Sequence, residues 1–188
     1  MMLKLCQMAR VPVSRAAFST SSPKDPYDNI PESIMEITQR KIYKVQGHPL
    51  STLIEKMETF FKEGKVSDLP TPRDHFKVFQ DFSPLVKVKE CFDDLGIPED
   101  HVSRRTTDTY YKSREICLRP HTSVHQIPLM KGDNKAFVCI GDVYRKDTVD
   151  RTHYPAFHQM EGVRIFDLKD IGAKDAKEGK IIAERDLK

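Results

Sequence analysis

Tryptophan is absent from this 188-residue sequence, and cysteine is scarce. The four cysteines are Cys6, Cys91, Cys117 and Cys139. Their wide spacing contains no C-x-x-C pair, which argues against a zinc ribbon or a disulfide framework and favours reduced thiols. No apolar run approaches the roughly 18 residues that a transmembrane helix needs. With 38% hydrophobic residues, the sequence instead predicts one globular domain with a core of its own.

Acidic residues are missing from the first 24 positions. The basic side chains there are Lys4, Arg10, Arg15 and Lys24. All 28 acids follow, together with 27 of the 31 basic residues, so the formal charge of +3 belongs to this leader. An Arg-, Ser- and Thr-bearing, acid-free start is typical of a mitochondrial transit peptide, with a disordered tail of chance composition as the alternative. We therefore expect residues 1–24 to direct residues 25–188 to the mitochondrial matrix.

Two segments have the apolar spacing of amphipathic helices. From Pro49, apolar residues recur every three or four positions until Gly64, a suitable C-terminal cap. A second helix is expected from Ser83 to Gly96, because Leu85, Val88, Phe92 and Leu95 share a spacing of three or four.

The second half of the sequence indicates strands. Residues 116–118 predict a short extended segment, and residues 122–130 predict a short helix with Thr122 as its N-cap. Residues 136–145 predict a buried strand, and residues 157–166 predict the strand that returns beside it. The polar connection between these two strands is too long for a tight hairpin, which is typical of a functional loop.

Polar side chains interrupt the apolar pattern of the returning strand. Gln159 and Glu161 are two residues apart and therefore share one face of it. Buried Gln and Glu side chains need polar partners, and together they suit an ammonium group. Arg145, at the end of the preceding strand, suits a phosphate. A cross-hairpin ion pair between Arg145 and Glu161 is the alternative.

His121 and His125 are spaced i, i+4, which could place two imidazoles on one helix face for zinc. The glutamate of an H-E-x-x-H site is absent, so no metal site is predicted.

Several separated segments together resemble the class II aminoacyl-tRNA synthetases, and the phenylalanyl enzymes in particular. Similarity to motif 2 lies in G-D-V-Y-R-K-D (141–147), H-Y-P (153–155) and F-H-Q-M-E-G (157–162). The segment L-R-P-H-T-S-V-H-Q (118–126) is similar to the family's L-R-x-H-T-S-x-x-Q element, and D-T-Y-Y (108–111) indicates the mitochondrial, single-chain form. The resemblance covers about residues 26–168, and it is specific because the motifs occur in the right order.

The resemblance implies a role for each matching residue. Arg145 would be the catalytic arginine that grips the α-phosphate of ATP. The loop residues Thr152, His153 and Tyr154 would close over the nucleotide, which brings Mg²⁺ with it. The residues implied for amino-acid binding are His121, Ser123, Gln126, Gln159 and Glu161.

The resemblance also implies an α/β (α+β) fold: an antiparallel sheet flanked by helices. Residues 25–188 would carry the motif 1 region and motif 2 of the catalytic domain and stop before motif 3. The implied function is that of a phenylalanine–tRNA ligase of the mitochondrial matrix. The enzyme would be a monomer, its substrates would be L-phenylalanine, ATP and tRNA(Phe), and no membrane association is implied. Because motif 3 would be missing, a non-catalytic synthetase-derived binding protein is the second interpretation.

Overall fold

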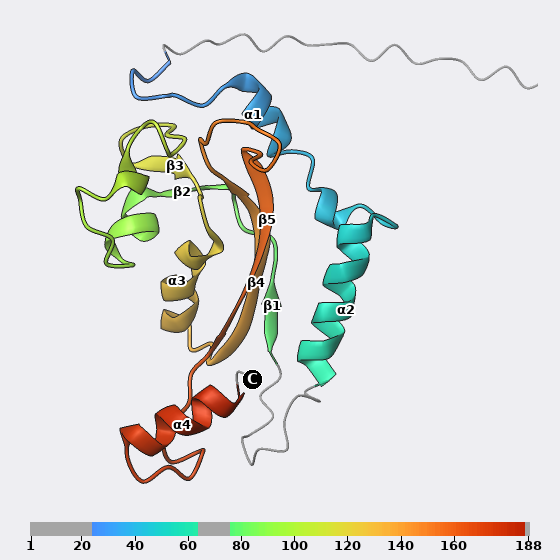
Figure 1. The fold of residues 1–188 in the computed structure, drawn as a ribbon, viewed down its shortest axis with the longest axis vertical. Coiled ribbons are helices and arrows are strands. Elements are labelled where there is room, and N and C mark those ends of the chain that lie inside the picture. The colour runs from blue at the N-terminus through green and yellow to red at the C-terminus, as the bar shows by residue number, and fades with distance from the viewer. Residues whose placement is uncertain (1–23, 64–75, 187–188) are drawn as a thin grey trace, which may run out of the picture.

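The computed structural model describes residues 24–63 and 76–186 (Figure 1). Its helical elements are α1 (Glu32–Ile37), η1 (Ile42–Lys44), α2 (Pro49–Glu63), η2 (Lys89–Asp93), η3 (Val102–Arg104), η4 (Thr122–His125), α3 (Gln126–Lys131) and α4 (Ala176–Asp186). Its strands are β1 (Lys77–Phe79), β2 (Leu85–Lys87), β3 (Ile116–Leu118), β4 (Ala136–Tyr144) and β5 (Ala156–Arg164). The described part is therefore of mixed α/β class. Residues 1–23 of the expected leader lie outside it, as does Gly64.

The main sheet has the strand order β1-β4-β5. β4 pairs antiparallel with β5 along all nine residues, whereas β1 pairs parallel with β4. The expectation of a wholly antiparallel sheet is thus wrong for β1. A parallel pair needs a long crossover, and here the whole β2–β3 region lies between β1 and β4 in the chain.

The two faces of this sheet are covered by different elements. Val138 and Ile140 on β4 pack with Tyr43 and with Ile54 of α2. Because side chains alternate along a strand, Cys139 and Gly141 point to the opposite face, where η4 lies. Figure 1 shows α2 and α3 on opposite sides of the sheet. Covering on both sides explains why every residue of β4 is buried. Each large apolar side chain buried there contributes about 1.5–3 kcal/mol.

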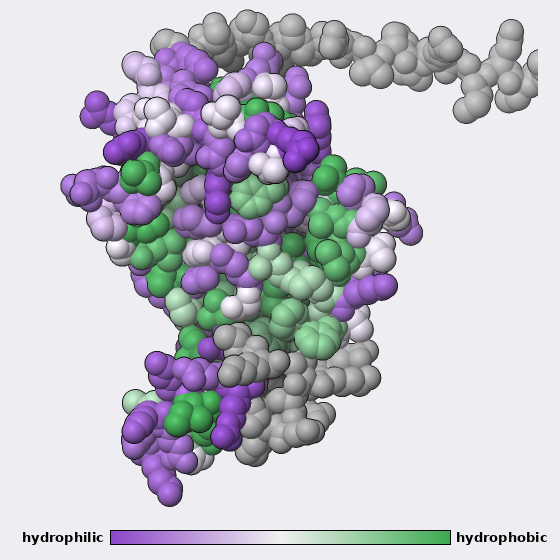
Figure 2. All heavy atoms as spheres, in the orientation of Figure 1, coloured by the Kyte–Doolittle hydropathy of each residue, from purple (hydrophilic) through white to green (hydrophobic). Residues whose placement is uncertain are grey.

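The helix predicted from Pro49 is confirmed as α2. Pro49 is its first residue, where the missing N–H removes no hydrogen bond. Ile54 faces the sheet, while Leu53 and Phe60 remain 52% and 50% exposed. Figure 2 shows hydrophobic side chains at the surface over this helix. Among the described residues, no helix is long and apolar enough to cross a membrane.

The helix predicted from Ser83 to Gly96 is wrong in its first part. Residues Leu85–Lys87 form β2, which pairs antiparallel with β3 and places Val86 opposite Cys117. Helical structure begins only with η2, which ends at Asp93, and Gly96 in the turn after it has a φ of +71°. Strand pairing prevailed over helical spacing because β3, about thirty residues away in the chain, offers unpaired backbone groups.

The short helix predicted for residues 122–130 is confirmed as η4 followed by α3. The role of Thr122 as its N-cap is wrong. His121 occupies the cap position without a side-chain cap, and the Thr122 hydroxyl is buried with no partner among the described residues. The tight first turn places Thr122 inside the helix rather than before it.

Gly141 has a packing reason to be glycine. A Cβ atom at this position would collide with the guanidinium group of Arg119. We expect Gly141→Ala to lower the free energy of unfolding by about 1–3 kcal/mol, because the arginine would have to move out of a closed space. Gly162→Ala is the matched control on the same sheet, since a Cβ there meets nothing within 4 Å. Its effect should stay within about 0.5 kcal/mol. Urea unfolding measures both, and equal effects of the two variants would contradict the packing argument.

Candidate functional site

Three predicted amino-acid-binding residues form a hydrogen-bonded network between β5 and the η4–α3 segment, and a fourth bonds to the η4 backbone beside it. The Glu161 carboxylate accepts hydrogen bonds from Ser123 Oγ at 2.8 Å and from Gln126 Nε2 at 3.1 Å. The Gln159 side-chain oxygen accepts one from the backbone N–H of Thr122 at 3.2 Å. Strand periodicity places Gln159 and Glu161 on this face, and the η4 turn presents its polar groups to them.

Among the described residues, no cation neutralises the carboxylate in this network. In the part of the chain that the structure describes, no Lys or Arg forms an ion pair with Glu161. Cys139 lies directly across from it on β4. Burial and the charge of Glu161 raise the pKa of the Cys139 thiol to about 12, so this thiol stays protonated. The site therefore offers a negative charge beside a thiol that stays protonated.

His121 lies next to this network, in a cleft of about 220 Å³. Other residues that line the cleft include Phe92, Ser103, Asp108, Arg145 and Asp147. The His121 Nε2 atom lies 3.8 Å from the Sγ of Cys91, and its buried Nδ1 has no partner among the described residues. Burial lowers the pKa of His121, so its imidazole is neutral near pH 7 and can accept a hydrogen bond.

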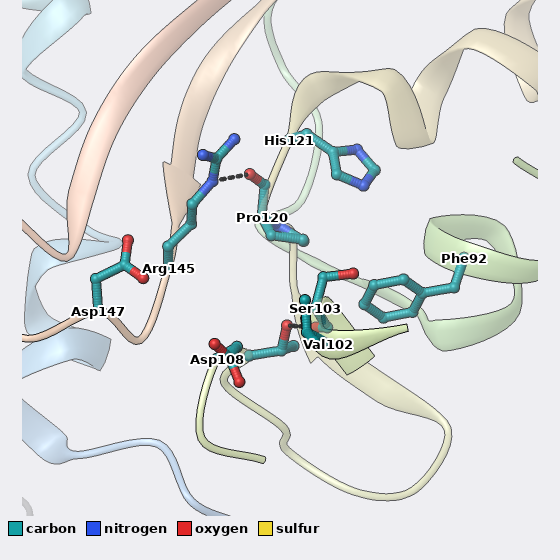
Figure 3. Close-up of a pocket in the computed structure, with 9 residues that line it drawn as sticks. Phe92, Val102, Ser103, Asp108, Pro120, His121, Arg145 and Asp147 are labelled. Carbon is teal, nitrogen blue, oxygen red and sulfur yellow. Dashed lines mark hydrogen bonds between the residues drawn. The ribbon is translucent and has the colours of Figure 1, made fainter. Parts of the chain in front are cut away.

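Arg145 extends from the end of β4 to the rim of the same cleft (Figure 3). Its Nε donates a hydrogen bond to the Pro120 carbonyl at 3.1 Å, and its guanidinium lies 5.0 Å from the Phe157 ring centroid. These two contacts hold the Arg145 guanidinium in one orientation beside the cleft.

The alternative cross-hairpin pair of Arg145 and Glu161 is wrong. The register places Glu161 opposite Cys139, while the Arg145 amide bonds to the Pro155 carbonyl at the far end of the hairpin. Pro155 and Glu161 are six positions apart along the chain, which corresponds to about 20 Å of extended strand.

The loop residues Thr152, His153 and Tyr154 are exposed and do not line this cleft. The Asp150 carboxylate organises the loop by accepting hydrogen bonds from the backbone N–H groups of Thr152 and His153 and from the Thr152 hydroxyl. These bonds hold the pKa of Asp150 below its usual range, and the contact with Asp150 raises the pKa of His153. The structure thus places Thr152 and His153 in one turn around Asp150, with Tyr154 directly after it.

Two polar features around the site had no predicted role. Arg119 is buried behind the network and hydrogen-bonded to His125, whose ring nitrogen is therefore occupied. Asp142 and His158 face each other on the α2 side of the sheet, with 2.6 Å between Oδ1 and Nδ1. The only signal for either was a charged residue within an otherwise apolar strand region. No group of three His, Cys, Asp or Glu side chains suited to a metal occurs within residues 24–63 and 76–186.

Comparison with known proteins gives a family match over residues 34–177, to the model described as tRNA synthetases class II core domain (F). The chain belongs to this family. It is 46% identical over 150 residues to the mitochondrial phenylalanine–tRNA ligase of Dictyostelium discoideum, covering 79% of this chain and 32% of that protein. It is 38% identical to the chloroplastic/mitochondrial ligase of Arabidopsis thaliana, covering 87% of this chain and 36% of that protein.

This class II synthetase chain therefore spans about a third of the length of the curated relatives it matches. A solved pyrrolysyl-tRNA synthetase from Desulfitobacterium hafniense superposes with a TM-score of 0.46 at 16% identity, covering 68% of this chain and 43% of that one. The assignment to the phenylalanine–tRNA ligase family rests on the sequence matches.

Proposed function

We propose that this chain supplies the amino-acid site of a phenylalanine–tRNA ligase. The Glu161 network is the observation that carries the proposal. A carboxylate held by Ser123 and Gln126, with no cation paired to it in the described chain, suits the ammonium group of an amino acid. Gln159 adds an amide on the same strand face, and neutral His121 adds an acceptor at the edge of the cleft.

We propose that Arg145 binds the α-phosphate of ATP. The amino-acid carboxylate would attack the α-phosphorus, the bond to pyrophosphate would break, and an aminoacyl-adenylate would form. No protein nucleophile takes part in this step, so positioning and charge stabilisation lower the barrier. Thr152, His153 and Tyr154 would reach the nucleotide by movement of their loop, in keeping with their exposed position.

Mg²⁺ would enter with ATP and help to neutralise the phosphate charge. The described residues include no three-ligand cluster, so the phosphate oxygens and water would supply most of its ligands. The activated phenylalanine would then pass to tRNA(Phe). We propose an enzyme of the mitochondrial matrix, in keeping with the names of its relatives and with the acid-free leader. Its resemblance to the single-chain form supports a monomer.

Import should remove the leader, with cleavage between Arg15 and Ser22. The Arg-containing, acid-free start followed by Ser and Thr residues supports this expectation. Mass spectrometry of the N-terminus of the protein from purified mitochondria measures it. Retention of Met1 in the mature protein would rule the transit peptide out.

Arg145→Ala in the full-length protein should lower kcat/KM for phenylalanine-dependent ATP–pyrophosphate exchange by about 10²-fold or more, because a phosphate contact that strengthens in the transition state is lost. The unfolding midpoint should change little, since the side chain is exposed. Arg185→Ala on α4 is the control for removal of an exposed arginine. Activity near that of the control would show that the motif 2 assignment is wrong.

Glu161→Gln should weaken phenylalanine binding about 10- to 100-fold and leave ATP binding within about twofold, because a neutral amide replaces a charge-assisted acceptor. Separate KM measurements for the two substrates in pyrophosphate exchange provide the comparison. Glu115→Gln, an exposed carboxylate beside β3, is the control. A selective loss of ATP affinity would instead assign Glu161 to the nucleotide.

The second candidate is a synthetase-derived protein that binds phenylalanine through the Glu161 network without catalysis. The two candidates differ in turnover. Phenylalanine-dependent pyrophosphate exchange by the full-length protein supports the ligase, whereas calorimetric binding of phenylalanine without exchange supports the binding protein.

A further inference from the structure

Arg119 is a buried cation without a carboxylate partner. It follows β3 and is 2% exposed. Its Nε donates to the Asp142 carbonyl at 2.6 Å, and its Nη1 donates to His125 Nε2 at 3.0 Å and to the Ser83 carbonyl at 3.4 Å. All three acceptors are neutral, and within the described residues no Asp or Glu side chain pairs with the guanidinium. Burying such a charge costs several kcal/mol before its contacts compensate.

The guanidinium of Arg119 lies on the same face of the sheet as the Glu161 network. It occupies the space that a side chain at position 141 would take, and Gly141 is paired directly with Gln159. Directly paired residues of antiparallel strands point to the same face. The next pair on this face is Cys139 with Glu161, about 7 Å along the strand. Arg119 therefore lies directly behind the residues proposed to hold the amino acid.

His125 links Arg119 to the η4–α3 side of the Glu161 network, where Ser123 and Gln126 lie. An arginine only donates, so His125 Nε2 is the acceptor and the proton of the neutral ring is on Nδ1. The ring is stacked on Phe82, with 3.8 Å between centroids and 11° between planes. Burial and the charge of Arg119 lower the pKa of His125 to about 4, which keeps the ring neutral. His125 ends η4, directly before Gln126 and two residues after Ser123.

We propose that Arg119 is a positioning residue for amino-acid binding, which joins β4 to η4 through His125 and so holds Ser123 and Gln126 against Glu161. This inference rests on the proposed function of the Glu161 network. Arg119 does not contact the amino acid. Its planar fork is required because Nε and Nη1 serve two different elements at once, β4 and η4.

Substitution of Arg119 tests the proposal by the change in KM for each substrate. In the full-length protein, Arg119→Met and Arg119→Lys should both raise the KM for phenylalanine about tenfold or more, with the KM for ATP within about twofold. Lysine keeps the charge but cannot bond to β4 and to His125 together. Arg105→Lys, on an exposed arginine, is the control. A normal phenylalanine KM in Arg119→Lys would overturn the proposal.

A second pair of variants preserves Arg119 and so avoids leaving its site empty. His125→Phe retains an aromatic ring against Phe82 but removes the acceptor, whereas His125→Gln retains an acceptor and loses the ring. The proposal expects a raised phenylalanine KM, about tenfold, only in His125→Phe. Equal values in the two variants would show that the contact with Arg119 does not matter for binding.

A spectroscopic measurement separates this inference from the proposed function. Nitrogen-15 NMR of histidine-labelled protein should show His125 as the neutral Nδ1–H tautomer at pH 7, with the tautomer preference lost in Arg119→Met. An unchanged His125 signal in Arg119→Met would overturn the positioning role. If the tautomer is as expected but the protein does not bind phenylalanine, the proposed function fails while the Arg119–His125 contact stands.

Discussion

The antiparallel pairing of β4 with β5 is the constraint on which the rest of the structure depends. Nine cross-strand pairs, from Ala136 with Arg164 to Tyr144 with Ala156, fix one register. Since side chains alternate along a strand, a slip of one residue would turn Gln159 and Glu161 toward α2 and bring His158 and Met160 to η4. The packing of Met160 on β5 against Val138 and Ile140 opposes that slip, so the hydrophobic core on one face determines the chemistry of the other.

Few charged groups lie in the network around Glu161, and burial determines which titratable side chains there are ionised. Glu161 is the acceptor of two hydrogen bonds, Arg119 is a cation behind it, and burial keeps His121 and His125 neutral. Neutral imidazoles do not repel an ammonium group, whereas two imidazolium ions would. The rim of the cleft differs, because the Arg145 guanidinium lies there against the Phe157 ring.

Local sequence patterns predicted the elements that do not depend on pairing with a distant segment of the chain. The helix α2 follows from its own apolar spacing, β4 follows from an apolar run of strand length, and β5 follows as the strand that returns beside it. The helix expected at Ser83 failed because Leu85, Val88 and Phe92 satisfy a helical spacing while Val86 and Lys87 pair with β3. The pairing of two strands that lie far apart in the chain cannot be detected from the local sequence pattern of either strand. The parallel position of β1 escaped prediction for the same reason.

The sequence by itself determined the family, through the order of its motifs, and the shared strand face of Gln159 and Glu161, through their spacing of two. Only the tertiary structure decided that Ser123 and Gln126 meet Glu161, that Arg145 lies at the far end of the hairpin from it, and that Arg119 fills the space above Gly141. Alternation along a strand is a local property of the backbone and can be counted along the chain. Contact between β5 and η4 depends on how the whole core packs, because an apolar interior fixes distances between segments that the covalent chain leaves free.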